Sequence, residues 1–242
     1  MRVPPALGAR AEGPGSSKPS CGPQRIRSAM TLISTICLSA FGLLLVTVLG
    51  WRVLGRRLSL PCPPALIWLL ENRVMENVAG SAAIIERAKV ARGMRVLDAG
   101  CGPGRATIPM AKHVGPQGQV VALDLQPGML ARLAERLVTH GVTNVRTVQG
   151  GLGEGLLGPA KFDRAIMVTV LGEIPDRLAA LREIHDALKP GGLLSITEVL
   201  PDPHYQSRRA VRRMAEEVGF QVEEAYSGWR SFTLNLTRSG GA

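Results

Sequence analysis

Cysteine is scarce in this chain, and its spacing argues against two kinds of structure. The 242 residues contain four cysteines, Cys21, Cys37, Cys62 and Cys101, and no two of them have the C-x-x-C spacing of a metal site. The four lie in different sequence contexts, which does not suit a disulfide framework. We therefore expect a protein of a reducing compartment, without disulfides and without a bound metal.

Acidic residues are also few, 19 against 29 basic ones, and the imbalance is uneven along the chain. Residues 1–60 carry eight Lys or Arg and one acid, whereas residues 61–242 carry 21 bases and 18 acids, a difference of only three. A nucleic-acid-binding surface would need its basic charge on the folded part of the chain. The basic N-terminal part suits anionic lipid headgroups better, and we expect no nucleic-acid partner.

The N-terminal part divides into two segments of opposite composition. Residues 1–29 are rich in Gly, Pro and Ser and are expected to be disordered. Residues 30–51 contain no charge, and this run is long enough to cross roughly 30 Å of hydrocarbon as a helix. A secretory signal peptide or a buried core helix are the alternatives, but the run ends without a small-x-small cleavage site. We predict a transmembrane helix over 30–51.

Residues 52–92 connect this helix to the rest of the chain. They combine a Pro-Cys-Pro-Pro stretch with the apolar run Ala-Leu-Ile-Trp-Leu-Leu. We predict a linker followed by an N-terminal helical lid, in which Trp68 and Met75 either line a substrate pocket or form the core of the lid.

Residues 94–107 contain an apolar run that ends in an acid and is followed by three alternating glycines. They read Met-Arg-Val-Leu-Asp-Ala-Gly-Cys-Gly-Pro-Gly-Arg-Ala-Thr. Glycines at a strand-to-helix turn let a ligand lie directly on the backbone, and the helix N-terminus offers it unpaired N–H groups. The pattern therefore predicts a cofactor site, but not a dinucleotide fingerprint, because Arg105 breaks G-x-G-x-x-G.

The pattern Asp98-x-Gly-x-Gly-x-Gly resembles motif I of the class I S-adenosylmethionine (SAM) dependent methyltransferases. Apolar segments at 119–124, 144–148 and 162–169 follow in the order of that fold. The segment 188–198 is similar to the Leu-Lys-Pro-Gly-Gly segment before strand five of many methyltransferases. The resemblance implies that residues 93–242 form an α/β, Rossmann-like domain. Its sheet would be mostly parallel and seven-stranded, with an antiparallel last strand near 229–237. Within the class, the chain looks closest to the ubiquinone/menaquinone small-molecule methyltransferases.

The resemblance also implies SAM as the cofactor and assigns its contacts. Asp98 and the glycine turn would surround the methionine part of SAM, Asp124 would bind the ribose, and Leu125 would line the nucleoside pocket. Two alternatives remain: Asp98 only orders its loop, or Asp124 caps the next helix. Gly151 stands where the family usually has an acid, which leaves the adenine to backbone groups, Leu152 or Glu154. The predicted cofactor-binding residues are Asp98, Gly100, Cys101, Gly102, Gly104, Asp124, Leu125, Gly151 and Leu152.

Candidates for the acceptor chemistry follow the fourth and fifth expected strands. Glu173 lies where cofactor and acceptor meet in similar proteins. It either contacts substrate or helps a proton leave, or it is only an acid that the dipole of the next helix stabilises. The later loop gathers Glu198, Asp202, His204 and Tyr205, and one of them either acts as a general base or caps the next helix. We predict Glu173, His204 and Tyr205 as catalytic residues.

Four arginines recur at helical spacing before the last expected strands: Arg208, Arg209, Arg212 and Arg213. They would form one basic helix face, either solvated or directed at lipid headgroups.

The combined prediction is a membrane-anchored SAM-dependent methyltransferase that acts on a small, apolar or lipid-like acceptor. Because SAM is kept in the cytosol, we expect a single-pass protein with its catalytic domain facing the cytoplasm. No Asn-Pro-Pro-Tyr or Asp-Pro-Pro-Tyr segment is present, which disfavours methylation of nucleobases or glutamine amides. The alternatives are a protein or RNA methyltransferase, or a catalytically inactive SAM-binding interaction protein. The sequence specifies neither the acceptor nor the oligomeric state.

Overall fold

The computed structural model describes residues 30, 32–43, 46–47, 50, 80–200 and 202–239. The chain divides into two units, Met1–Leu49 and Gly50–Ala242, which we describe separately. The expected disorder at 1–29 lies outside the described residues, and so does the part of the expected linker and lid at 52–92 that precedes residue 80.

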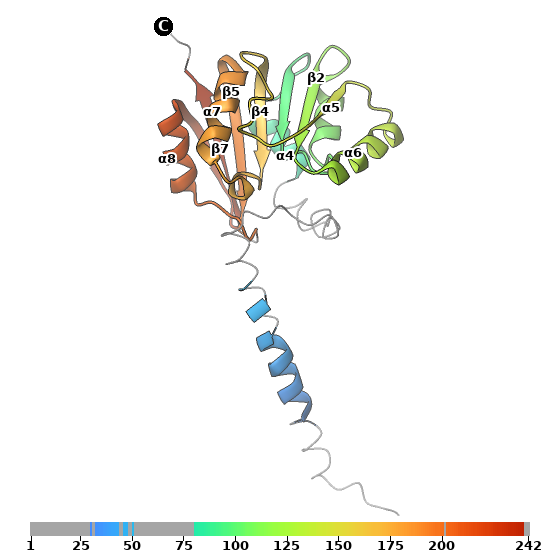
Figure 1. The fold of residues 1–242 in the computed structure, drawn as a ribbon, viewed down its shortest axis with the longest axis vertical. Helices are drawn as coiled ribbons and strands as arrows, with labels where there is room; N and C mark the ends of the chain where they lie inside the picture. The colour runs from blue at the N-terminus through green and yellow to red at the C-terminus, as the bar shows by residue number, and fades with distance from the viewer. Residues whose placement is uncertain are drawn as a thin grey trace, which may run out of the picture. The chain divides into compact units, whose positions relative to one another are not determined.

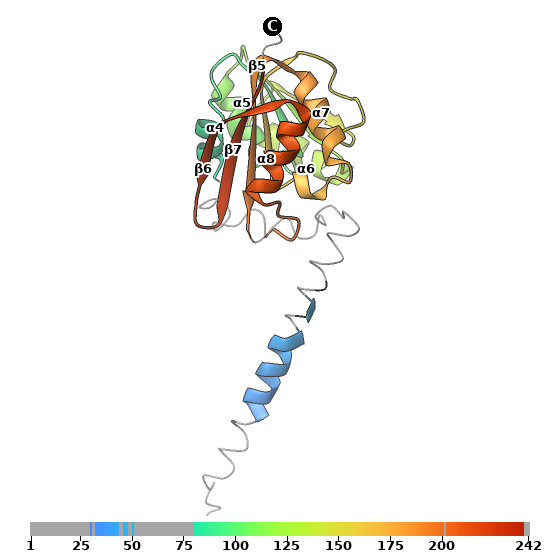
Figure 2. The ribbon, with the colours of Figure 1, turned by 90° about the vertical axis from the view of Figure 1, so that its left-hand side faces the viewer.

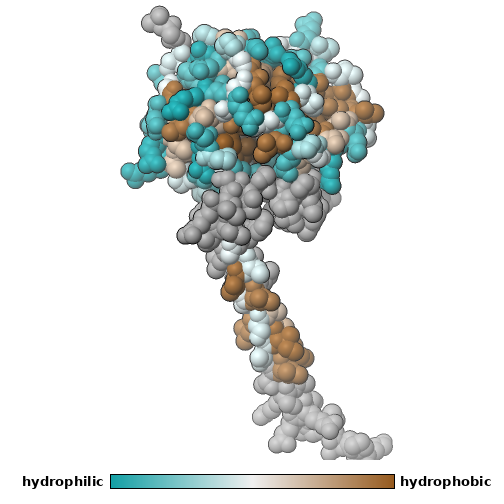
Figure 3. Space-filling model, in the orientation of Figure 1, coloured by the Kyte–Doolittle hydropathy of each residue, from teal (hydrophilic) through white to brown (hydrophobic). Residues whose placement is uncertain are grey.

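In the first unit, residues 32–43 are helical and carry exposed apolar side chains such as Leu32, Ile33 and Phe41 (Figure 3). None of the helices among the described residues is both long enough and apolar enough to span a bilayer. The expected span at 30–51 is described only in part, since residues 31, 44–45, 48–49 and 51 lie outside the described set.

The second unit is built on a seven-stranded sheet with the order β3-β2-β1-β4-β5-β7-β6 (Figure 1). Every strand pair is parallel except those of β7, which runs antiparallel to both β5 and β6. This confirms the predicted mostly parallel sheet with an antiparallel last strand. The strands are β1 Arg95–Ala99, β2 Gln119–Asp124, β3 Val145–Gln149, β4 Phe162–Val168, β5 Leu188–Val199, β6 Phe220–Ser227 and β7 Ser231–Arg238.

Helices cover both faces of this sheet, which explains why the central strands are apolar along their whole length. Successive residues of β1 show the division: Val96 packs in one cluster with α4 and α5, and Leu97 packs in another with α7 and α8. Leu133 of α6 packs beside Ile108 of α5. The helices are α4 Ser81–Arg87, α5 Thr107–Val114, α6 Pro127–Thr139, the short 3-10 helix η2 Leu171–Glu173, α7 Arg177–Ala187 and α8 Arg208–Val218.

The parallel strands bring five loops to one edge of the sheet. Because β1 to β5 run in the same direction, the loops after Ala99, Asp124, Gln149, Val168 and Val199 share this edge. Ligands of open α/β sheets bind at the carboxyl ends of the strands, so this edge is where a site is expected.

Candidate cofactor and acceptor site

The three glycines of the turn after β1 have three different surroundings. A Cβ at Gly100 (φ +78°) would meet Cγ2 of Val170 at 2.4 Å, and one at Gly104 (φ +88°) would meet Cδ1 of Leu133 at the same distance. A Cβ at Gly102 would meet nothing within 4 Å. Gly100 therefore lets the turn approach the loop after β4, Gly104 lets α6 pack, and Gly102 presents bare backbone to a cleft.

Two buried carboxylates order this turn. Asp98 accepts a hydrogen bond from Oγ1 of Thr107 at 2.6 Å, and burial raises its pKa to about 6, with the charge of Asp124 adding to the shift. Asp124 accepts from the N–H of Gly102 at 2.8 Å and from that of Gln126 at 2.9 Å. The N-cap of α6 is Gln126, not Asp124. The Asp124 carboxylate thus ties the end of β2 to the glycine turn, and its remaining lone pairs can accept from a ribose hydroxyl.

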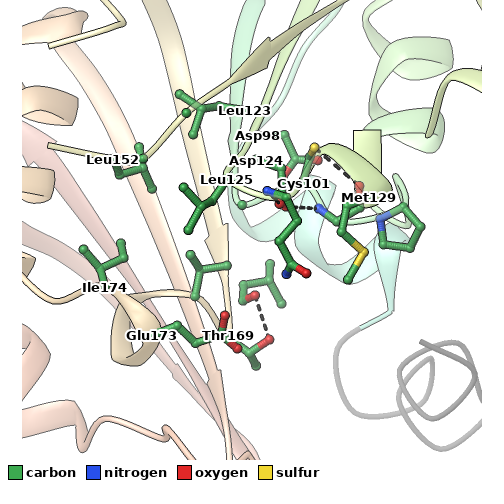
Figure 4. Close-up of a pocket in the computed structure, with 18 of the residues that line it drawn as sticks. Asp98, Cys101, Leu123, Asp124, Leu125, Met129, Leu152, Thr169, Glu173 and Ile174 are labelled. Atoms are coloured by element: carbon green, nitrogen blue, oxygen red, sulfur yellow. Dashed lines mark hydrogen bonds between the residues drawn. The ribbon is translucent and has the colours of Figure 1, made fainter. Parts of the chain in front are cut away.

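These residues border a cleft of about 340 Å³, a volume within the range of roughly 300–1,000 Å³ found for small-ligand pockets. In Figure 4, Cys101 and Met129 lie on one side of it, and Leu152, Glu173 and Ile174 lie on the other. Gly104, His204 and Tyr205 do not line it. The predicted site residues that do are Asp98, Gly100, Cys101, Gly102, Asp124, Leu125, Gly151, Leu152 and Glu173.

At the end of β3, the acid that the family usually places at position 151 is replaced by one three residues later. The N–H of Gly151 donates to Oε2 of Glu154 at 3.1 Å, and a Cβ at Gly151 would lie 2.6 Å from Oε1 of Glu154. Gly151 therefore makes room for the Glu154 side chain, which also lines the cleft. A carboxylate is therefore present at this end of the cleft, supplied by Glu154, which the sequence offers as one alternative for the adenine contact.

At the opposite end, a short 3-10 turn carries Glu173 into the lining of the cleft. The guanidinium of Arg177 donates to the carbonyl oxygens of Leu171 at 3.1 Å and Gly172 at 2.9 Å, which fixes the turn. A Cβ at Gly172 would overlap the carbonyl oxygen of His204. The loop after β5 is therefore packed directly behind the turn that holds Glu173.

His204 and Tyr205 belong to that loop and lie behind the wall of the cleft. His204 is buried, and the Tyr205 ring packs edge-on against Phe232 with 6.0 Å between centroids. The N–H of His204 donates to Oδ1 of Asp202 at 2.6 Å, and that of Tyr205 donates to the carbonyl of Asp202 at 3.2 Å. Their catalytic role stays a prediction.

Glu198, near the end of β5, is a buried acid. Its Oε2 accepts from the N–H of Gln206 at 3.1 Å, and its Oε1 has no hydrogen-bond partner among the described residues. Burial raises the pKa of Glu198 to about 8; the nearby acids Asp202 and Glu173 add to the shift and Arg177 opposes it. The carboxyl group is therefore mostly protonated at neutral pH. The sequence places Glu198 near the site but gives no sign of this burial.

Thr169 is a site residue that the sequence analysis missed. It lines the cleft and has a φ of +55°, an unusual conformation for a β-branched residue. Its N–H donates to the carbonyl of Thr197 at 2.9 Å, and its hydroxyl donates to that of Val168 at 2.7 Å. Met129, Ile174 and Pro175 also line the cleft, and no motif marks them.

Comparison with known proteins identifies this arrangement. Residues 96–192 match the protein family described as "Methyltransferase domain". These matches support a class I SAM-dependent methyltransferase domain in this part of the chain. A demethylmenaquinone methyltransferase of Geobacillus stearothermophilus is 32% identical over 110 residues, 46% of this chain and 47% of the relative. One of Staphylococcus aureus (strain JH9) is 37% identical over 109 residues, 45% of this chain and 44% of the relative. The chain thus matches about half the length of these relatives.

A solved structure shares the fold. A SAM-dependent methyltransferase from Aquifex aeolicus superposes with a TM-score of 0.69 at 24% identity, over 73% of this chain and 99% of the other. The methyltransferase domain supports SAM as the cofactor of this chain. The cleft fits SAM in three respects. Gly102 presents open backbone, Asp124 lies at the end of β2, and apolar Leu125 and Leu152 border the space between them and Glu173.

Proposed function

We propose that this methyltransferase transfers the SAM methyl group to a small, largely apolar acceptor held between the glycine turn and Glu173. The observation that carries the proposal is the lining of the cleft beyond the glycine turn. Leu125 is 55% exposed although it faces a cleft, and Leu152 and Ile174 lie opposite the glycine turn (Figure 4). An open apolar wall beside Glu173 suits a ring that carries one ionisable group.

SAM supplies an electrophilic methyl group, and the protein must align the acceptor and remove a proton. Transfer breaks the sulfur–methyl bond, forms a bond from methyl to acceptor, and releases the acceptor proton. Positioning accounts for most of the catalysis in such an in-line displacement. Glu173 supplies a carboxylate that can take the proton of a phenol or enol. Ile174, next to Glu173 in the lining of the cleft, keeps water away from the reacting atoms.

The identity of the relatives favours a quinone-like acceptor, since those matched are named demethylmenaquinone methyltransferases. We propose in addition that residues 30–51 anchor the chain in a membrane, with the catalytic domain on the cytoplasmic side. The exposed apolar side chains of residues 32–43 support this. A tether raises the local concentration of an acceptor dissolved in the bilayer without any new contact.

The test has two stages. Calorimetry with SAM and with its demethylated product measures cofactor binding, and methyl transfer is then followed separately into organic-extractable and aqueous fractions of a lipid extract. We expect extractable product, and more of it from the full chain than from a chain lacking residues 1–57. Product confined to the aqueous fraction, formed equally by both chains, would disprove the apolar acceptor and the anchor. SAM binding without any methyl transfer would favour an inactive binding protein.

Glu173→Gln tests the proton acceptor within the same assay. We expect it to lower kcat while the affinity for SAM stays unchanged. Glu183→Gln is not a suitable control, because Glu183 accepts from the N–H groups of Gly153 and Leu157. Glu217→Gln removes an exposed charge on α8 from a position that does not line the cleft, and it should leave both quantities unchanged.

A further inference from the structure

The hairpin between β6 and β7 presents a tryptophan to solvent. Trp229 is 87% exposed, and the guanidinium carbon of Arg230 lies 5.2 Å from the centroid of its ring. The turn is closed by the N–H of Gly228, which donates to the carbonyl of Ser231 at 2.8 Å. A large aromatic side chain held out on a closed turn contributes nothing to the core of the domain.

The tip of this hairpin lies at the same end of the sheet as the cleft, where the carboxyl ends of β1 to β5 are. β5 and β6 both run antiparallel to β7, so they point the same way (Figure 2), and Val199 and Ser227 pair with Ser231 and Phe232. The N–H of Leu200 donates to the carbonyl of Arg230 at 2.7 Å, which holds the first residue after β5 against the tip. Leu200 is itself 46% exposed.

Positive charge surrounds these two apolar side chains. Arg208, the first residue of α8, donates to Oγ of Ser227 at 3.0 Å and so lies beside the hairpin. Arg209, Arg212 and Arg213 are further exposed basic residues on the first turns of α8, of which Arg212 pairs with Glu216 at 2.7 Å. The loop after β5 also contains an acid, Asp202. Its carboxylate accepts a hydrogen bond from the N–H of His204 at 2.6 Å, within the same loop. We call Leu200, Arg208, Trp229 and Arg230 the rim patch.

We propose that the rim patch docks on an anionic lipid surface and holds the cofactor edge of the domain against the bilayer. Tryptophan and arginine together suit a membrane interface, where the indole lies at headgroup level and the guanidinium groups meet lipid phosphates. A stable protein partner would require about 800 Å² per side, far more than one Trp and one Leu can supply. The proposal goes beyond the anchor and the acceptor chemistry, because it assigns the contact to the catalytic domain itself.

Trp229 can report its own environment. The chain has three tryptophans, and replacing the other two (Trp51→Phe, Trp68→Phe) makes its fluorescence specific. The full-length chain is combined with vesicles of phosphatidylcholine alone, or of phosphatidylcholine and phosphatidylglycerol in equal amounts, by removing detergent. Only chains that float with the vesicles are measured. We expect blue-shifted emission and quenching by brominated acyl chains in the anionic vesicles, both weakened by salt.

Charge variants test which arginines hold the tip. Arg208→Gln and Arg230→Gln should each weaken docking about fivefold, as expected for one basic residue near an anionic surface. Arg146→Gln and Arg182→Gln remove the same charge from exposed positions on β3 and α7 and should have no effect.

Three results would overturn the proposal. The first is Trp229 emission in anionic vesicles that matches emission in detergent, and the second is equal quenching in anionic and neutral vesicles. The third is a blue shift in detergent that grows with protein concentration, which would assign the patch to a second copy of the chain. None of these readouts depends on methyl transfer, so failure here is distinguishable from failure of the proposed function.

Discussion

The two ends of the cleft are built from contacts of different range along the chain. At the cofactor end, most hydrogen bonds are local. Asp124 accepts from the N–H two residues ahead, the N–H of Gly151 donates to Glu154 three residues ahead, and Asp98 accepts from Thr107 nine residues ahead; the bond from Gly102 to Asp124, 22 residues apart, is the exception among these. At the acceptor end, the turn that holds Glu173 abuts the backbone of His204, and Thr169 binds the carbonyl of Thr197. Local contacts leave a motif in the sequence, whereas contacts across some thirty residues do not.

The largest effect expected at the acceptor end is a pH-dependent loss of stability caused by Glu198. Its pKa is raised from the ordinary 4.5 to about 8, so the folded state binds a proton that the unfolded state has released. Stability is therefore fully present below pH 4.5 and falls as the pH rises through 8, by at most about 5 kcal/mol. Glu198→Gln should abolish this fall. Denaturant unfolding of both proteins from pH 5 to 9 measures it.

The control for this experiment is the exposed Glu217→Gln, which should follow the wild-type pH profile. Asp98 also has a raised pKa, but it contributes equally to all three proteins. If wild type and Glu198→Gln lose stability in parallel, then Glu198 is not a buried neutral acid and the acceptor end is more open to water than the structure shows.

The next largest effect is expected at the cofactor end, where substitution of two glycines of one motif should lower stability by different amounts. Gly100→Ala should cost about 2–4 kcal/mol of stability, because its Cβ would meet Val170 and its φ is positive. Gly102→Ala adds a methyl group in open space and should cost only about 1–2 kcal/mol for its φ. We expect Gly102→Ala to fold and yet bind SAM weakly. Equal unfolding free energies for the two variants would contradict this division.

These two glycines also show how much the sequence could predict. The motif placed the turn, the acids at the ends of β1 and β2, and the order of the strands, and the seven-stranded sheet is confirmed. It could not tell which glycine faces the cleft and which faces a neighbour, because Val170 and Leu133 are distant in sequence. Likewise, the sequence suggests that Glu198 lies in the same loop as His204, but the structure places Glu198 inside β5. The burial of both residues depends on how the loop after β5 packs, against Glu198 through Gln206 and against Gly172 of η2 through His204.

Asp124→Ala is expected to have a moderate effect on the cofactor alone. Loss of a charge-assisted bond to a ribose hydroxyl should weaken SAM binding by about 1–3 kcal/mol in calorimetry. The same carboxylate holds the N–H groups of Gly102 and Gln126, so part of the loss could come from a disordered turn. Asp124→Asn retains one acceptor oxygen and should fold better while still binding weakly. Unchanged affinity in both variants would exclude Asp124 from the ribose site.

The smallest expected effect is a gain in stability rather than a loss, and it concerns Thr169. A β-branched residue is disfavoured at a φ of +55°, whereas Asn tolerates this region, so Thr169→Asn should stabilise the fold by about 1 kcal/mol. Thr139→Asn serves as the control. The hydroxyl of Thr139 also donates to a local carbonyl, that of Glu135, but its backbone is helical and carries no such strain.

Because Thr169 lines the cleft, the gain in stability should come with slower methyl transfer. A higher melting temperature with unchanged kcat would mean that the strained residue only closes the turn after β4. A lower melting temperature would mean that the bonds from Thr169 to Val168 and Thr197 outweigh the strain, and the acceptor end would then depend on Thr itself.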